Sequence, residues 1–239
     1  MIRPLGLWHQ MPLACMIEEK EMEKTTFIFD LDGLLADSEI IAYRCYEELL
    51  KDYGQTITLE EYINGFSGNT LVGNCKLILK MHPELPYDLD SLVPHIHALE
   101  KYIMERDGVP LKPGAKELLA ALKAQNRKIV LATSSLRDRA EKLLRENDVF
   151  KYFDDQVYGS ELEHGKPAPD IFQLAAAKVH SEPEECVVLE DSVLGIEAAV
   201  AAGIDVICIP DMKKPPQQYI DKTLAVLPSL ENLLPYINK

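Results

Sequence analysis

The sequence predicts an α/β fold, in which helices cover both faces of a parallel β-sheet and an all-helical segment is inserted after the first strand. Two observations predict it. Five short apolar, β-rich runs without polar alternation lie between residues 25 and 209, with helical patterns between them, whereas 38–108 contains no such run. The 239 residues, 47% hydrophobic and 27% charged, are typical of a globular chain and argue against disorder, collagen or coiled coil.

The apolar runs and the helical patterns alternate along most of the chain. The predicted strands are Thr25–Phe29, Lys128–Ala132, Gln156–Tyr158, Cys186–Leu189 and Asp205–Ile209. The predicted helices between them are Gly114–Asn126, Leu136–Asn147, Asp170–Val179 and Val193–Ala202. Pro169 suits the start of a helix, and Gly203 suits a helix end. Strands of this kind, each followed by a helix, indicate a three-layer, Rossmann-like core.

The strand-free stretch predicts a separate helical cap. Its expected helices are Ile40–Tyr53, Leu59–Ile63, Thr70–Met81 and Leu89–Arg106. We therefore expect a cap at 38–108 and a core made of 25–37 and 109–239. Residues 1–24 are expected to be a mobile N-terminal extension, or the product of a start codon placed upstream of Met16 or Met22.

Charge and cysteine content restrict the partners and the compartment. Lys and Arg total 25 against 39 for Asp and Glu, a net charge of −14, so a nucleic acid or an anionic membrane is not expected as partner. The five cysteines include no C-x-x-C pair, which indicates a reduced, cytoplasmic protein, and Cys186 and Cys208 are expected to be buried. We expect a monomer or a small homo-oligomer.

Polar residues follow four of the predicted strands directly or in the next loop. They are Asp30 and Asp32, then Thr133-Ser134-Ser135, then Lys166, then Glu190-Asp191. Each group alone is typical of a turn, of a helix cap or, for Lys166, of a solvated loop. Because ligands bind beyond the carboxyl ends of parallel strands, their occurrence together predicts one site at that edge of the sheet.

These segments resemble the four motifs of the haloacid dehalogenase superfamily. Phe27–Glu39 is similar to the first motif, Leu131–Ser135 to the second, Gly165–Phe172 to the third and Leu189–Ile196 to the fourth. The resemblance covers about residues 25–210. The helical insert is similar to the subgroup with an α-helical cap, which includes sugar-phosphate phosphatases and β-phosphoglucomutase.

The resemblance implies a phosphatase that forms an aspartyl-phosphate on Asp30. It implies a Mg²⁺ held by Asp30, the backbone carbonyl of Asp32 and Asp191, with Glu190 near or in the shell; hard oxygen ligands suit this ion. It further implies that the phosphoryl oxygens are bound by the Lys166 ammonium and the Thr133 hydroxyl. The backbone amides of Ser134 and Leu31 are implied to bind the same oxygens.

Asp32 bears on the type of reaction. By the resemblance it is the general acid for the leaving alcohol and then the general base for water. Dehalogenases and phosphonate hydrolases of the superfamily lack an aspartate there, so Asp32 indicates a P–O substrate.

The predicted cap bears on whether the product is free phosphate. The mutases of this subgroup have a histidine shortly after the first motif and basic residues in a cap loop. Here Ile41-Ala42-Tyr43 offers no histidine, and the loop Asn64–Asn69 has no lysine or arginine. We therefore expect a phosphatase acting on a small phosphorylated metabolite, a sugar or polyol phosphate. A phosphosugar mutase and a catalytically vestigial phosphometabolite-binding protein stay as alternatives.

The polar residues of that cap loop have two interpretations. Asn64, Ser67 and Asn69 are either hydrogen-bonding groups for the substrate or turn residues that shape a corner between two helices.

Overall fold

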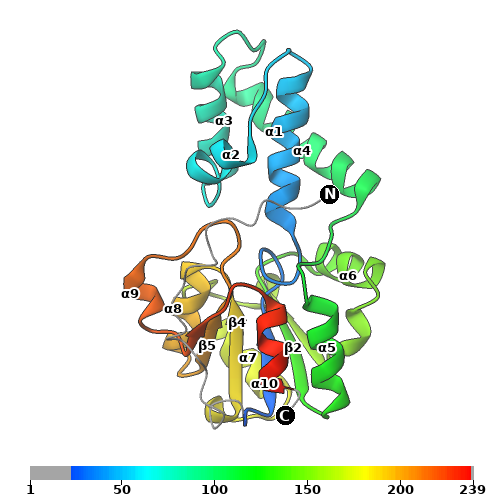
Figure 1. Ribbon diagram of the computed structural model, residues 1–239, viewed down its shortest axis with the longest axis vertical. Helices are drawn as coiled ribbons and strands as arrows, with labels where there is room; N and C mark the ends of the chain where they lie inside the picture. Colours follow the sequence, from blue (N-terminus) through cyan, green and yellow to red (C-terminus); the bar gives the residue numbers. More distant parts are fainter. Residues whose placement is uncertain (1–22, 238–239) are drawn as a thin grey trace. The chain divides into compact units, whose positions relative to one another are not determined.

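The computed structural model describes residues 23–237, and their contacts divide the chain into two units (Figure 1). The first, here called the core unit, comprises 23–35, 111–211 and 215–237. The second, here called the cap unit, comprises 36–110 together with 212–214, a short stretch from a distant part of the sequence. Of the predicted extension at 1–24, residues 1–22 lie outside the described residues.

The core unit is built on a six-stranded, fully parallel sheet with the order β3-β2-β1-β4-β5-β6, which confirms the predicted α/β fold. The strands are β1 (Thr26–Phe29), β2 (Lys128–Thr133), β3 (Asp155–Tyr158), β4 (Cys186–Glu190), β5 (Asp205–Cys208) and β6 (Ala225–Val226). The last strand was not predicted, because two residues carry no readable pattern. In the central pairing, Phe29 lies opposite Leu131 and Leu189. The residues that follow β1 are therefore level with the end of β4.

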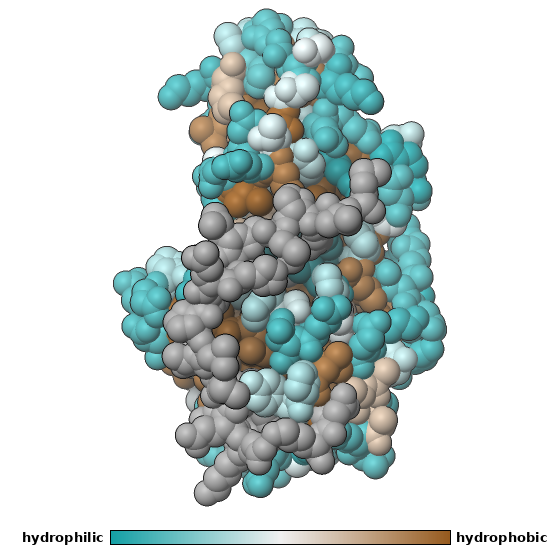
Figure 2. Space-filling view, viewed as in Figure 1, coloured by the Kyte–Doolittle hydropathy of each residue, from teal (hydrophilic) through white to brown (hydrophobic). Residues whose placement is uncertain are grey.

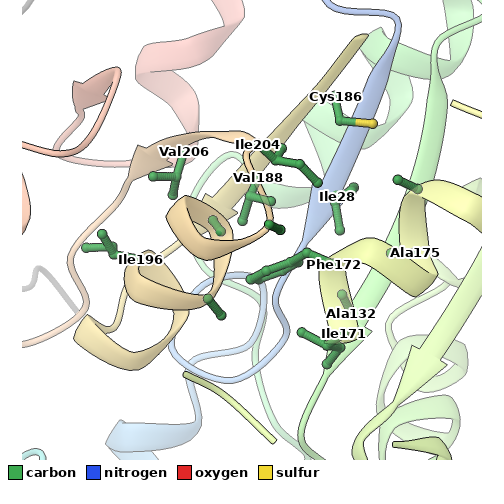
Figure 3. Packing of buried hydrophobic residues seen from close by; sticks show 14 of the residues in the cluster. Ile28, Ala132, Ile171, Phe172, Ala175, Cys186, Val188, Ile196, Ile204 and Val206 are labelled. Atoms are coloured by element: carbon green, nitrogen blue, oxygen red, sulfur yellow. The ribbon is translucent and has the colours of Figure 1, made fainter. Parts of the chain in front are cut away.

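Helices cover both faces of this sheet (Figure 1). On one face lie α7 (Asp170–Lys178) and α8 (Val193–Ala201), and on the other lie α5 (Ala115–Ala124) and α10 (Leu234–Ile237). Figure 3 shows Phe172 reaching from α7 toward α8, near Ile28 of β1, within a buried hydrophobic cluster to which Ile196 of α8 also belongs. The remaining helices of the unit are α6 (Arg137–Glu146), α9 (Gln217–Ile220) and the short 3₁₀ turns Phe150–Tyr152, Gly159–Glu161, Pro183–Glu185 and Leu230–Leu233.

The cap unit consists of helices and connecting loops, as predicted, and its described residues contain no strand. Its helices are α1 (Ser38–Lys51), α2 (Leu59–Gly65), α3 (Leu71–Met81) and α4 (Leu89–Asp107). The Thr58 hydroxyl caps α2 and the Asp88 carboxylate caps α4, each by accepting an N–H of the first turn. Buried Tyr46, Tyr62 and Phe66 pack their rings together at centroid distances of 5.7–6.1 Å and form an aromatic core for this unit.

The exposed side chains match the acidic, charge-rich composition. Hydrophilic residues form most of the described surface on the face drawn in Figure 2. Among residues 23–237, no helix combines the length and the apolar character that crossing a lipid bilayer requires. The four cysteines of this part of the chain form no disulfide with one another and are buried, including Cys186 and Cys208 as expected.

Candidate active site

Three buried charged side chains meet beyond the carboxyl ends of β1 and β4. The Lys166 ammonium, from the loop before α7, donates to Asp30 Oδ1 and to Glu190 Oε1, both at 2.5 Å. The side chains of Lys166, Asp30 and Glu190 are only 7%, 10% and 1% exposed. Asp30 and Glu190 are neighbours because the parallel register brings the ends of β1 and β4 to the same level. The structure thus brings three of the predicted site residues into direct contact.

The charged groups of this cluster shift one another's pKa values. Burial raises the pKa of Asp30 to about 7; Lys166 opposes this shift and Glu190 adds to it. Burial, followed by the nearby Glu190 and Asp30 carboxylates, also raises the pKa of Asp191 well above its ordinary value. Burial alone would lower the pKa of Lys166, but Asp30 and Glu190 outweigh it and raise that pKa. The cluster therefore holds more negative charge than one ammonium neutralises.

The surplus of carboxylates fits a divalent cation. Oxygens of Asp30, Glu190 and Asp191 lie within 4.8 Å of one another. Three ionised carboxylates and one ammonium have a net charge of −2, which one Mg²⁺ would balance, and carboxylate oxygens are ligands that this ion prefers. Asp30 and Asp191 could supply ligand oxygens to such an ion. Glu190 is engaged elsewhere, because its Oε2 accepts the N–H groups of Asp191 and Ser192 and the Ser192 hydroxyl, each at 2.9 Å.

Two glycines make room for these carboxylates. Gly33, which follows β1 and has φ +83°, lies against the Asp191 carboxylate, and Gly195 of α8 lies against the Glu190 carboxylate. A Cβ at either position would overlap with the adjoining carboxyl group. Both glycines lie inside segments that resemble the family motifs, and close packing against an acidic side chain explains their residue type.

Asp32 has a different set of partners. Its Oδ1 and Oδ2 accept hydrogen bonds from the two terminal nitrogens of Arg139, at 2.8 and 2.9 Å. The Ser135 hydroxyl donates to Oδ2 at 2.6 Å and accepts from Arg139 at 2.5 Å. The structure therefore places the Asp32 carboxylate in a network with the loop after β2 and the first turn of α6.

Apart from Lys166, the predicted phosphate-binding residues lie at the ends of β1 and β2 or directly after them. Thr133 is buried, and its Oγ1 accepts the Ser135 N–H at 3.0 Å, which leaves its hydroxyl hydrogen to donate elsewhere. Ser134 is exposed, whereas the side chain of Leu31 is fully buried, so Leu31 can serve a ligand only through its backbone. The two segments have the polar groups expected for binding a phosphoryl group.

The predicted residues of the cap loop differ in their surroundings. The Asn69 amide donates to the Gly65 carbonyl at 2.8 Å and to Asn74 Oδ1 at 3.1 Å, which favours the interpretation as a turn-shaping residue. Ser67 is buried, and Asn64 is exposed. The Lys213 ammonium donates to the Ser67 carbonyl at 2.8 Å. The loop itself contains no lysine or arginine, as the sequence shows, but a lysine 146 positions away places an ammonium beside it.

A comparison with protein families identifies the chain. The profile of the haloacid dehalogenase-like hydrolases matches residues 24–203. The chain belongs to this family. The resemblance carried by the four motifs is confirmed, and the protein is a hydrolase.

Individual relatives of this hydrolase agree with the assignment. It is 35% identical over 225 residues to a probable pseudouridine-5'-phosphatase of Drosophila melanogaster, covering 90% of this chain and 94% of that protein. It is 34% identical over 180 residues to a phosphorylated carbohydrates phosphatase of Thermotoga maritima, covering 74% and 81%. Among solved structures, a putative β-phosphoglucomutase from Thermotoga maritima superposes with a TM-score of 0.74 at 29% identity, covering 89% and 98%.

Two residues that contact predicted site residues of this hydrolase, Arg139 and Lys213, were not predicted from the sequence. Arg139 lies in the first turn of α6, four residues after Ser135, which precedes that helix. Lys213 lies in the segment after β5 and has no local feature that links it to Ser67. The contacts of Arg139 with Asp32 and of Lys213 with Ser67 appear only when distant segments pack together.

Proposed function

We propose that this hydrolase releases phosphate from a small phosphorylated metabolite, a sugar or polyol phosphate, through an aspartyl-phosphate on Asp30. The enzyme is a phosphoric monoester hydrolase. The observation that carries the proposal is the buried contact of Asp30 with Lys166, next to the carboxylates of Glu190 and Asp191. A phosphate monoester is a dianion, so a carboxylate attacks it only where cations offset the repulsion.

The first half of the reaction transfers the phosphoryl group to the protein. An Asp30 carboxylate oxygen forms a bond to phosphorus while the bond between phosphorus and the ester oxygen breaks. Asp32 gives a proton to the departing alcohol. Lys166, the Thr133 hydroxyl and the amides of Ser134 and Leu31 bind the phosphoryl oxygens.

The second half regenerates the carboxylate. Asp32 takes a proton from a water molecule, whose oxygen bonds to phosphorus as the bond to Asp30 breaks and inorganic phosphate leaves. Mg²⁺, held by Asp30, the Asp32 carbonyl and Asp191 with Glu190 beside it, would shield the negative charges of nucleophile and substrate from each other.

Similarity to named relatives supports the substrate class. Two of the curated relatives are described as phosphatases, one of phosphorylated carbohydrates and one, as probable, of pseudouridine-5'-phosphate. These substrates share a phosphorylated, hydroxyl-rich carbon skeleton. Asn64, Ser67 and Asn69 of the cap loop are proposed to face the part of the substrate that carries the hydroxyl groups.

One observation keeps a phosphosugar mutase as the second candidate. Lys213 provides the cap loop with a positive charge, and a structurally similar protein is described as a putative β-phosphoglucomutase. A mutase would return the phosphoryl group of Asp30 to a second hydroxyl of the sugar, with no net release of phosphate.

A phosphate-release screen separates these functions. The purified chain is incubated with a panel of sugar, polyol and nucleoside monophosphates, with Mg²⁺ or with EDTA, and Asp30→Ala is the blank. The proposal predicts Mg²⁺-dependent phosphate release from at least one sugar or polyol phosphate and none from the blank. Isomerisation without phosphate release would identify the mutase, and inactivity toward every ester, p-nitrophenyl phosphate included, would favour a vestigial binding protein.

A reducing, cytoplasmic location is part of the proposal. It is supported by the four cysteines within residues 23–237, which are buried and form no disulfide with one another.

A further inference from the structure

We propose that Arg139 is a positioning residue, which holds the Asp32 carboxylate in the orientation needed for its two proton transfers. This inference rests on the proposed function, in which Asp32 is the general acid and base. It concerns a residue outside the segments that resemble the family motifs.

The geometry is that of a clamp on one carboxylate. The two terminal nitrogens of Arg139 bind the two oxygens of Asp32, one each, at 2.8 and 2.9 Å. A two-pronged contact of this kind restricts rotation of the carboxylate, which a single hydrogen bond or a lysine ammonium does not. Ser135 closes the network, because its hydroxyl donates to Asp32 and accepts from Arg139.

The location of Arg139 argues against a purely structural role. It lies in the first turn of α6, where the helix dipole disfavours a positive charge. The side chains of Arg139 and Asp32 are both 33% exposed, so solvent screens the attraction between their charges. The arginine thus lies where the helix dipole opposes it, and its two-pronged contact fixes the orientation of the Asp32 carboxylate.

Orientation is what proton transfer to a leaving group requires. The terminal torsion of an aspartate is broad, so an unrestrained carboxylate samples many directions. A displacement of about 1 Å at a reacting group reduces a rate by roughly 100-fold. Loss of the clamp should therefore impair the steps that use Asp32 and spare the attack by Asp30.

The first test is a double-mutant cycle measured with p-nitrophenyl phosphate in the presence of Mg²⁺. Arg139→Met is prepared alone and together with Asp32→Ala. We expect Arg139→Met to lower steady-state turnover about 10- to 100-fold when Asp32 is present, and less than about 2-fold when Asp32 is already alanine.

An equal loss in both backgrounds would overturn the proposal, because Arg139 would then act independently of Asp32. Normal turnover of Asp32→Ala would overturn the proposal together with the role of Asp32, whereas inactivity of the unmodified chain would reject the proposed function itself.

The second test separates the two chemical roles by the leaving group. Phenyl phosphate and p-nitrophenyl phosphate have similar shapes, but phenolate is more basic and needs a proton to depart. In the first turnover, Arg139→Met should slow the cleavage of phenyl phosphate at least about 10-fold and that of p-nitrophenyl phosphate less than about 3-fold. Similar losses for both esters would contradict the inference.

Two further variants serve as controls. Arg137→Met removes another arginine of the same turn, which pairs with Glu161 and Glu141, and should leave turnover within about 2-fold of normal. Arg139→Lys keeps the charge and the solubility of the helix but loses the two-pronged contact. Its turnover should therefore lie between that of the unmodified chain and that of Arg139→Met. If Arg139→Met unfolds, as judged by circular dichroism, the comparison of the two esters is made with Arg139→Lys.

Discussion

The backbone of Gly33 packs directly against the carboxylate of Asp191, with no room for a side chain between them. The two residues come from the ends of β1 and β4, and this contact places Asp191 beside Asp30 in the proposed metal site. Gly33 also has a positive φ, which disfavours any other residue.

Gly33→Ala is expected to impair Mg²⁺ binding more than folding. The new methyl group would displace Asp191, so addition of Mg²⁺ should no longer raise the melting temperature, and phosphate release should fall at least about 10-fold. Gly203→Ala is the matched control, because Gly203 also has a positive φ but has open space around it. Each variant should lose about 1 kcal/mol of stability from backbone strain, and only Gly33→Ala should lose the response to Mg²⁺. An unchanged Mg²⁺ response in Gly33→Ala would contradict the assignment of Asp191.

Stabilisation by Mg²⁺ is expected to increase with pH. The folded-state pKa of Asp30 is about 7, above its ordinary value of 3.8, so without metal the favourable contribution of the protonated form is lost as the pH rises through 7. Mg²⁺ binds the ionised carboxylates and should offset this loss. The difference in melting temperature with and without Mg²⁺ should therefore be larger at about pH 8 than at about pH 5.5. In Asp30→Asn the dependence on pH should be weaker, and a larger Mg²⁺ effect at the lower pH in the unmodified chain would reject this account.

Replacement of Lys166 by methionine is expected to abolish most catalysis. It removes the only ammonium that contacts Asp30 and Glu190 among the described residues, and the Asp30 pKa should rise further because its largest opposing influence is lost. We expect turnover to fall roughly 100- to 1,000-fold, with weaker inhibition by inorganic phosphate. Lys178→Met, which removes a lysine of α7 paired with Glu161 and Asp155, is the control and should retain most activity. Steady-state assays with and without added phosphate measure both effects.

Lys213 is expected to affect substrate selection and not the chemical step. Its ammonium is bound to the Ser67 carbonyl of the cap loop, so Lys213→Met should raise KM for the best sugar or polyol phosphate about 5-fold or more and leave p-nitrophenyl phosphate within about 2-fold. Lys214→Met tests the effect of removing one positive charge from the same segment. Equal changes for both substrates, or for both variants, would show that Lys213 has no part in selection.

Much of the fold and the type of site could be predicted from the sequence. Uninterrupted apolar runs such as Cys186–Leu189 form buried strands because both faces of the sheet are covered, and amphipathic or well-capped segments form the helices. Burial and capping depend on neighbours in sequence, so they leave a local pattern. The acidic and basic residues after those strands could be predicted to lie near one another because parallel strands end at a common edge.

The tertiary structure decided which of these groups touch. The register of β1 against β4 places Asp30 next to Glu190, with the Lys166 ammonium in contact with both. The clamp of Arg139 on Asp32 joins residues 107 positions apart. Such contacts depend on how remote segments pack and which rotamers their side chains adopt, and neither property has a periodic or compositional signature along the chain.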